Sequence, residues 1–374
     1  MGLTKYKLGE LIERSTVNNK DLKYGIDLIA GVNNDGVFTS PKGNPLDVDL
    51  KPYKLVNNGA FVYNPTRIDL GSLAYRTEGF CIVSHLYIIF YLNEKGKELV
   101  DPYYLYIYFH RDEFRREVRF RNFGSQRPEF SFSDMADISI TLPSIEKQRK
   151  FVNVYLAFQD NLAAYQSKVE ELKLVCDGYM NQLKKKCGKA KVRDYVELCD
   201  ERNYDNHYTL NDLRGISIQK KFIDTKADMQ GVSLTPYIIV KPDYFAFVPV
   251  TSRNGEKITL AINDTDNTYI VSSAYTVFRV KDKQKLLPNY LFMFFDRPEF
   301  DRYARFNSWG SAREVFTMDD MNDVRIPIPD ISVQKEIVNI HKCYIERQRI
   351  AAKLKEQLNN LCPILIKGSL ETSN

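Results

Sequence analysis

The chain repeats itself over its whole length, at an offset of about 186 residues. The prolines of a recurring Pro-x-x-x-x-Gln motif, Pro143 and Pro329, lie 329 − 143 = 186 positions apart. Since the chain has 374 residues, this offset divides it into two halves. Further matches follow in the same order: Pro102 with Pro288, Glu113-Phe114 with Glu299-Phe300, Gly124-Ser125 with Gly310-Ser311, Asp134-Met135 with Asp320-Met321, and Gln148 with Gln334. An ordered series of this kind predicts two diverged copies of one structural unit.

The first part of each copy has the pattern of a β-rich module. Residues 59–63, 81–92 and 269–280 are rich in β-branched and aromatic side chains and are bounded by Gly, Asn, Asp or Pro. Pro102 and Pro288 each suit the first turn of a short helix. We therefore expect an α+β module with a mostly antiparallel sheet in each copy.

A long heptad pattern follows the proline motif of each copy. Apolar residues alternate at spacings of three and four, which is typical of a coiled-coil seam. Arg347 interrupts the second seam, and Pro363 should end or kink its helix. The positions are Phe151, Tyr155, Phe158, Leu162, Tyr165, Val169, Leu172 and Cys176 in the first copy, and Ile337, Ile340, Tyr344, Arg347, Ala351, Leu354, Leu358, Leu361 and Leu365 in the second.

A seam of this length needs a partner, and the equivalent helix of the other copy is the economical one. We therefore predict two helices paired as an antiparallel coiled coil with an internal pseudo-twofold repeat. The alternative is that each helix packs on its own module or on another chain. The predicted domains are residues 1–144 and 189–330, which are the modules, and residues 145–188 and 331–374, which are the helices.

Composition excludes several classes of protein. The six cysteines have no CxxC or CxxH spacing, which argues against a zinc site and favours free thiols in the cytoplasm. No apolar run has the length of a membrane span or the form of a signal peptide, so we expect no membrane partner. The net charge of +5 is mild, and a polyanion-binding surface would have to come from local clusters.

The doubled order of Gly-Ser-x-Arg, an Asp-bearing stretch, Ile-x-x-Pro-x-x-x-x-Gln and a heptad helix resembles the specificity subunit of type I restriction–modification systems. The resemblance covers essentially the whole chain. It implies two target recognition domains alternating with two conserved spacer helices. Members of that family do not cut or methylate DNA themselves. They read double-stranded DNA and hold two methyltransferase subunits and the motor–nuclease subunits.

The resemblance therefore implies a non-catalytic chain that reads an asymmetric, bipartite target. It implies no catalytic, cofactor-binding or metal-binding residue here. S-adenosylmethionine would bind the methyltransferase partner, and ATP and Mg would serve restriction in the motor–nuclease. Symmetry supports this reading independently, because two modules on a pseudo-twofold frame can read two half-sites of a duplex.

Contacts with DNA need cations for the phosphates and planar donors for the base edges. Arg-bearing polar loops in both copies, at residues 63–67, 121–127, 251–257 and 308–313, meet this need, and Gly-Ser recurs in the loops at 121–127 and 308–313. The predicted DNA-binding residues are Asn64, Thr66, Arg67, Arg121, Ser125, Gln126, Arg127, Thr251, Ser252, Arg253, Asn254, Lys257, Ser308, Trp309, Ser311 and Arg313.

Structural roles compete with several of these assignments. Arg127 and Arg313 would equally suit ion pairs with Asp134 and Asp320. Trp309, the only tryptophan, suits a core position at least as well as a base contact. Asn254-Gly255 is also a strong hairpin signal. The arginines from Arg111 to Arg119 fit a solvated helix with local ion pairs.

Catalytic functions find no support in the motifs. Asn64-Pro65-Thr66-Arg67 lacks the second proline and the aromatic residue of an amino-methyltransferase motif. No Walker A loop is present, which excludes the motor. The remaining alternative is a coiled-coil scaffold with two protein-binding modules and no role on DNA. A DNA reader would lose affinity steeply with salt, whereas such a scaffold has no DNA affinity to lose.

Overall fold

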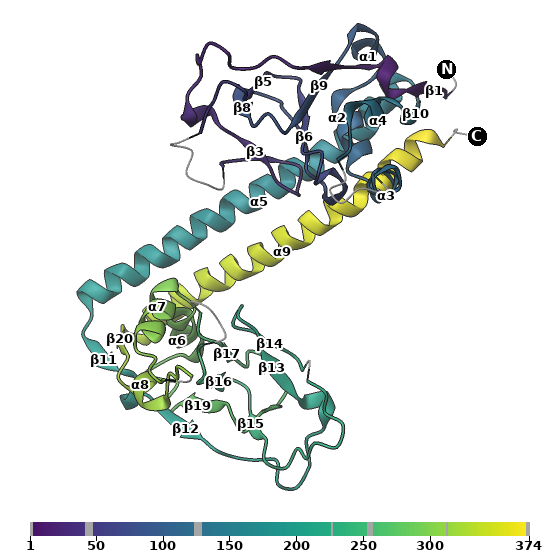
Figure 1. The fold of residues 1–374 in the computed structure, drawn as a ribbon. Helices are drawn as coiled ribbons and strands as arrows, with labels where there is room; N and C mark the ends of the chain where they lie inside the picture. Colours follow the sequence, from purple (N-terminus) through teal and green to yellow (C-terminus); the bar gives the residue numbers. More distant parts are fainter. Residues whose placement is uncertain are drawn as a thin grey trace. The chain divides into compact units, whose positions relative to one another are not determined.

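The computed structural model describes residues 3–41, 48–122, 129–225, 227–252, 257–311 and 313–371. The chain divides into two compact units. The first comprises Met1–Tyr165 and Ile350–Asn374, and the second comprises Gln166–Arg349. Each unit contains one β-rich module and a part of each long helix (Figure 1).

The first module is built on a four-stranded antiparallel sheet with the order β2-β9-β6-β7. Three two-stranded pairs, β1-β10, β3-β4 and β5-β8, accompany it. The strands are β1 (Thr4–Lys7), β2 (Ile12–Ser15), β3 (Gly31–Val32), β4 (Phe38–Thr39), β5 (Lys54–Val56), β6 (Phe61–Tyr63), β7 (Leu73–Tyr75), β8 (Cys81–Val83), β9 (Ile88–Leu92) and β10 (Ser139–Leu142). The helices are α1 (Glu94–Leu99), α2 (Pro102–Phe109), α3 (Asp112–Arg121) and α4 (Phe132–Ala136).

The second module repeats this topology strand for strand. Its four-stranded sheet has the order β12-β19-β16-β17, and its pairs are β11-β20, β13-β14 and β15-β18. The strands are β11 (Lys189–Lys191), β12 (Val196–Cys199), β13 (Arg214–Ile216), β14 (Phe222–Asp224), β15 (Ile238–Val240), β16 (Phe245–Phe247), β17 (Leu260–Ile262), β18 (Tyr269–Val271), β19 (Thr276–Val280) and β20 (Arg325–Pro327). The helices are α6 (Pro288–Phe295), α7 (Pro298–Phe306) and α8 (Met318–Asn322). The predicted duplication and the α+β class are confirmed.

In each module, an equivalent pair of stacked phenylalanines joins two neighbouring strands of the four-stranded sheet. Phe61 lies opposite Phe90, and their stacked rings are 5.1 Å apart between centroids. Phe245 lies opposite Phe278 in the same way, at 4.8 Å. All four side chains are fully buried, so each pair joins two strands and fills the core at once.

Two long helices follow the modules: α5 (Ile145–Lys186) and α9 (Ile331–Leu370). Every position of both predicted seams is buried or half-buried. Pro363 does not end α9, which continues to Leu370. Among the described residues, no helix is both long and apolar enough to cross a membrane.

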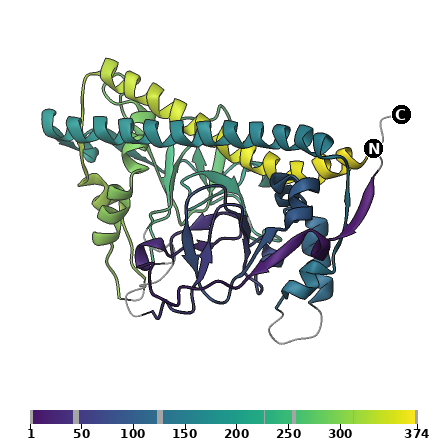
Figure 2. The same cartoon turned by 90° about the horizontal axis from the view of Figure 1, so that it is seen from above.

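Within each unit, the two helices pack together and on the module. In the first unit, Phe151 of α5 lies against Gly368 of α9, and Lys147 donates to the carbonyl of Glu371, so the helices run antiparallel there (Figure 2). The same core takes in Leu365 of α9 and the module. In the second unit, Met180 of α5 and Ile337 of α9 share one core with the module. Helix pairing and packing on a module, between which the sequence did not decide, therefore occur together.

The recurring glutamine is a buried connection between helix and module. The Gln148 side-chain amide donates to the carbonyls of Leu99 (2.8 Å) and Pro143 (2.9 Å), and its oxygen accepts from the Asp101 N–H (2.9 Å). Gln334 makes the same three bonds in the second unit, with Lys285, Pro329 and Leu287. Both side chains are fully buried. The Pro-x-x-x-x-Gln motif therefore joins the first turn of each long helix to its module.

Candidate nucleic-acid interface

The loop after β6 is a tight turn that presents polar side chains to solvent. The Asn64 side-chain oxygen accepts hydrogen bonds from the Thr66 N–H (3.0 Å) and the Thr66 hydroxyl (2.9 Å). The Arg67 N–H donates to the Asn64 carbonyl at 3.0 Å. Thr66 and Arg67 are exposed as a result, and the Arg67 guanidinium is accessible to a ligand.

This turn is hydrogen-bonded to Phe130, which lies three residues beyond the second predicted loop of the same module. The Phe130 N–H donates to the Pro65 carbonyl at 3.0 Å, and the Tyr63 hydroxyl donates to the Phe130 carbonyl at 3.2 Å. The structure therefore brings the Asn64–Arg67 turn next to Phe130, which is far from it in the sequence. Three of the predicted contacts on the second loop, Ser125, Gln126 and Arg127, lie outside the described residues.

Arg121 lies in a network of ion pairs. Its guanidinium contacts the Glu117 carboxylate at 3.0 Å and the Asp137 carboxylate at 3.3 Å. Lys7 also binds Asp137, and the hydrogen bonds from Lys7 and Arg121 lower the pKa of Asp137. These bonds favour a structural role for Arg121, which holds the end of α3 against the β1–β10 edge.

The remaining arginines of α3 make mostly local contacts. Arg115 and Arg116 pair with the acidic residues three positions earlier in the helix. Arg119 reaches Asp69 at 3.3 Å, in the 3-10 turn after the Asn64–Arg67 loop. The expectation of a solvated helix with ion pairs is met.

The second module joins its two predicted loops by backbone bridges. Val315 pairs with Val250 on one side and with Trp309 on the other. The Phe316 N–H donates to the Pro249 carbonyl at 2.8 Å, as Phe130 donates to Pro65 in the first module. Loop residues 249–252, 309–311 and 313–315 therefore lie on one edge.

The side chains on this edge differ in their exposure. Trp309 is 70% exposed, which excludes the core position considered for it. Ser252, Lys257, Ser311 and Arg313 are also exposed. No ion pair joins Arg313 to Asp320 in the part of the chain that the structure describes. Asp320 instead caps α8, where its carboxylate accepts from the N–H and hydroxyl of Thr317. Arg253 and Asn254 lie outside the described residues.

Two of the predicted contacts are buried. The Thr251 hydroxyl donates to the Glu314 carbonyl at 3.2 Å, and the Ser308 hydroxyl donates to the Ala304 carbonyl at 2.7 Å. Both side chains are less than 10% exposed. Their hydroxyls are used within the module, which favours a structural role for both residues.

Two exposed aromatic residues are missing from the predicted contacts. Phe120 is 83% exposed and Phe306 is 77% exposed. They occupy the same position in the two copies, since 306 − 120 = 186. The repeat offset could have revealed them in the sequence, because Arg119-Phe120 and Arg305-Phe306 match at that offset. Both pairs lie near the end of a helix.

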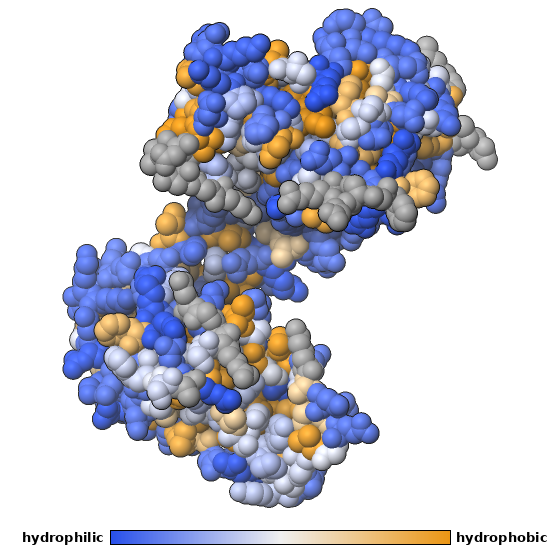
Figure 3. All heavy atoms as spheres, viewed as in Figure 1, coloured by the Kyte–Doolittle hydropathy of each residue, from blue (hydrophilic) through white to orange (hydrophobic). Residues whose placement is uncertain are grey.

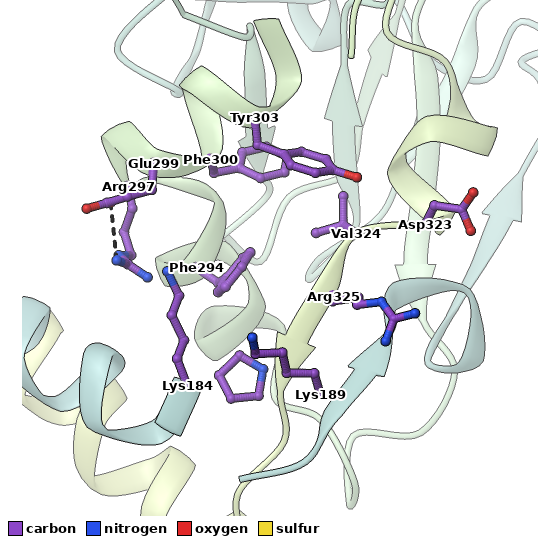
Figure 4. A pocket seen from close by; sticks show the side chains of 11 residues that line it. Lys184, Lys189, Phe294, Arg297, Glu299, Phe300, Tyr303, Asp323, Val324 and Arg325 are labelled. Atoms are coloured by element: carbon purple, nitrogen blue, oxygen red, sulfur yellow. Dashed lines mark ion pairs between the residues drawn. The ribbon is translucent and has the colours of Figure 1, made fainter. Parts of the chain in front are cut away.

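A cationic cavity of about 440 Å³ lies in the second unit (Figure 4). Lys184 and Lys189 lie beside the Phe294 ring there, and Arg297 pairs with Glu299 at 3.2 Å. Burial and the nearby Arg297 guanidinium lower the pKa of Lys184. Arg325 also lines this cavity. Among the described residues, no ion pair involves Lys184, Lys189 or Arg325, so the lining has a surplus of positive charge that suits an anion.

The first module does not reproduce this cationic lining. Glu117 stands at the position of Tyr303 (303 − 117 = 186), and its carboxylate binds Arg121. Ser139 stands at the position of Arg325 (325 − 139 = 186). A ligand that both modules bind alike therefore cannot depend on the cavity.

Comparisons with known proteins agree with this architecture. The family described as type I restriction modification DNA specificity domain matches the chain twice, over residues 3–174 and 184–360. No curated protein matches the chain. Among solved structures, the type I restriction-modification system S subunit from M. genitalium has a TM-score of 0.62 at 10% identity, covering 100% of this chain and 97% of that one. The HsdS subunit from Thermoanaerobacter tengcongensis has a TM-score of 0.40 at 15% identity, covering 99% and 97%.

Two copies of one module, each continued by a long helix, place the chain in the class of duplicated two-module proteins with paired long helices. The two family matches cover most of the chain, which therefore belongs to the family of type I restriction modification DNA specificity domains. It is a DNA specificity subunit, and it works on DNA as a part of a restriction–modification complex.

Proposed function

We propose that the chain reads an asymmetric bipartite target, with one half-site bound by residues 1–144 and the other by residues 189–330. The observation that carries this proposal is the identical strand order of two modules whose loops differ. The first module presents Thr66 and Arg67 on the short turn after β6, whereas the longer loop after β16 in the second module presents Ser252 and Lys257. Two modules with the same strand order but different exposed loop residues are suited to bind two half-sites of different sequence.

The non-catalytic role belongs to the same proposal. Residues 145–188 and 331–374 dock two methyltransferase subunits, because a duplicated chain offers two equivalent surfaces to two copies of one partner. The motor–nuclease subunits join the same assembly. S-adenosylmethionine binds the methyltransferase partners, and ATP and Mg serve restriction in the motor–nuclease. The complex acts in the cytoplasm, where its DNA lies.

The exposed residues of both edges supply the DNA contacts. Arg67 and Arg313 suit bidentate contacts to guanine or to phosphates, and Lys257 suits a phosphate. The remaining contacts are the exposed residues Thr66, Ser252, Trp309 and Ser311 and the half-buried Asn64. The runner-up, a protein-binding scaffold without a role on DNA, has no support from the family match.

Exchange of one module tests the bipartite reading. Residues 1–144 are replaced by the same region of a relative with another target, and the chain is co-expressed with its methyltransferase. Methylation mapping of the cellular DNA should show a change in one half of the methylated motif only. The reciprocal exchange of residues 189–330 is the matched control and should change the other half. A change of both halves after either exchange would contradict the modular reading.

A further inference from the structure

Two phenylalanines take the same position in the two modules and project into solvent. Phe120 lies in the last turn of α3 and Phe306 is the last residue of α7. Hydrophilic residues cover most of the face of each unit drawn in Figure 3. A single exposed apolar side chain is ordinary. Here, however, the same large apolar residue is about four-fifths exposed at the same position in both diverged copies. This repetition indicates that the two phenylalanines have the same function in the two modules.

An arginine accompanies each phenylalanine. Arg116 and Arg302 precede Phe120 and Phe306 by four positions, which places them on the same helix face. Each is exposed, and its one ion pair with a described residue is to a glutamate three positions earlier, at 3.5 Å for Arg116 and 4.0 Å for Arg302. Exposed pairs of this kind contribute little to stability, so a phosphate can readily replace the glutamate.

The aromatic position is continuous with the edge that carries the proposed DNA contacts. Three residues after Phe306, Trp309 enters the backbone bridges that tie Val315 to Val250. In the first module, Phe130 lies ten positions after Phe120 in the sequence, and its N–H bonds to Pro65 of the Asn64–Arg67 turn. Arg313 and Lys257, on the second edge, are exposed and form no ion pair with a described residue.

If the two modules recognise different half-sites, a residue that both modules share cannot distinguish the bases of those half-sites. It must contact something that both half-sites present alike. Stacked base pairs flanked by phosphates are common to any duplex, and every base has a π-face on which an aromatic ring can stack once a base step opens. Apolar side chains also wedge between base steps and kink the duplex. An arginine one turn away adds the phosphate contact.

We propose that Phe120 and Phe306 stack on or wedge between DNA bases independently of sequence, one in each half-site, with Trp309 beside the second. This inference rests on the proposed DNA-reading function and adds a contact that sets affinity rather than specificity. It assigns the exposed end of α3 and α7 to the DNA face of each module.

Binding of a fluorescent duplex of random sequence tests the proposal, because the contact does not depend on sequence. The full-length chain is used in complex with its methyltransferase subunit. Phe120→Ala and Phe306→Ala should each lower the affinity about fivefold or more. The slope of log affinity against log salt should stay unchanged, since no phosphate contact is lost. Phe306→Tyr should keep the affinity because it keeps the aromatic face.

Leu86→Ala is the matched control. Leu86 is 63% exposed in the first module, and Ala274 stands at the equivalent turn position of the second, where both N–H groups bond a serine hydroxyl two residues earlier. This variant should bind DNA as the parent does. Thermal unfolding of all variants should match the parent, since every exchanged side chain is exposed.

The outcomes separate the inference from the function on which it rests. If the parent complex binds the duplex and both alanine variants bind equally well, stacking is refuted and the DNA-reading function stands. If the variants lose the methyltransferase subunit while the chain keeps its DNA affinity, the aromatic residues are a protein contact and the inference is wrong. A parent that binds no duplex would overturn both.

Discussion

At the scale of single residues, the two copies carry different residues at one position of an equivalent hairpin turn, a glycine in the first copy and a lysine in the second. Gly36, between β3 and β4, has a φ of +74°, and a Cβ there would lie 2.1 Å from Nε2 of His110. The equivalent residue of the second copy is Lys220, with a φ of +58°. Its ammonium contacts the Asp301 carboxylate at 2.8 Å and the Phe295 carbonyl at 2.6 Å. One copy buries an imidazole and the other buries an ion pair beneath the same hairpin turn.

His110 makes the first unit sensitive to acid. Its Nδ1–H donates to the Tyr106 carbonyl at 2.8 Å, and Nε2 is buried without a partner among the described residues. Burial lowers the pKa of His110 to about 4, against an ordinary value near 6.5. The imidazole is therefore neutral in the folded protein. Its contribution to stability is complete above pH ~6.5 and is lost progressively as the pH falls from there towards 4.

We predict that His110→Asn reduces the pH dependence of stability. Asparagine keeps a donor for Tyr106 but cannot titrate. The free energy of unfolding of the parent should fall by roughly 3 kcal/mol more than that of the variant between pH ~7.5 and ~4, by the linkage of pKa to stability. Urea unfolding at several pH values measures this difference. Parallel pH profiles for the two proteins would refute the assignment.

At the scale of elements, packing overrides propensity at the end of α9. A proline inside a helix removes one hydrogen bond and costs ~3 kcal/mol. The helix nevertheless continues through Pro363 to Leu370. Cys362, Leu365 and Ile366 around it are buried in the core of the first unit. Their burial offsets the cost, because each apolar side chain removed from water contributes about 1.5–3 kcal/mol.

The glutamine of the recurring motif should matter more than any exposed residue of the long helices. Gln148→Ala leaves two carbonyls and one N–H of the first module without their partner, and each such loss costs roughly 1–3 kcal/mol. We expect a total loss of about 3 kcal/mol or more in the free energy of unfolding, measured in urea.

Gln182→Ala, at an exposed position of the same helix, is the control and should change stability by less than about 0.5 kcal/mol. Gln334→Ala should repeat the effect in the second unit, and the two losses should add because the sites share no partner. An equal response to Gln148→Ala and Gln182→Ala would show that the buried amide is dispensable.

At the scale of the whole molecule, the end of the chain completes the first unit. Ser369 of α9 shares a 2.7 Å hydrogen bond with the Tyr104 hydroxyl of α2, and Leu365 lies in the core of that module. The first unit thus needs residues from both ends of the sequence, whereas Gln166–Arg349 forms the second unit from one continuous segment.

Deletion of residues 361–374 should therefore weaken the first unit selectively. Loss of Cys362, Leu365 and Ile366 exposes apolar surface of the first core only. Hydrogen exchange followed by mass spectrometry should become at least about tenfold faster in β2, β6 and β9, because each 1.4 kcal/mol of lost stability raises local opening tenfold. The strands β12, β16 and β19 should keep their protection. Deletion of residues 372–374 is the control, and equal acceleration in both modules would refute the prediction.

The sequence by itself determined the duplication, the two long helices and the class of the modules. These follow from patterns that are linear in the chain: a constant offset, a heptad spacing, and prolines that begin short helices at Pro102 and Pro288. The offset also held the clue to Phe120 and Phe306. Such patterns survive divergence because local backbone geometry requires them wherever the element is retained.

Only the tertiary structure decided which side chains are available to a ligand. Arg121, Thr251 and Ser308 have the chemistry of DNA contacts, but Glu117, Glu314 and Ala304 engage their polar groups. Trp309 suited a core and proved to be exposed. Tertiary structure also decided that α9 closes the first unit. Burial and hydrogen-bond partners depend on contacts between residues far apart in the chain, and no local pattern records those contacts.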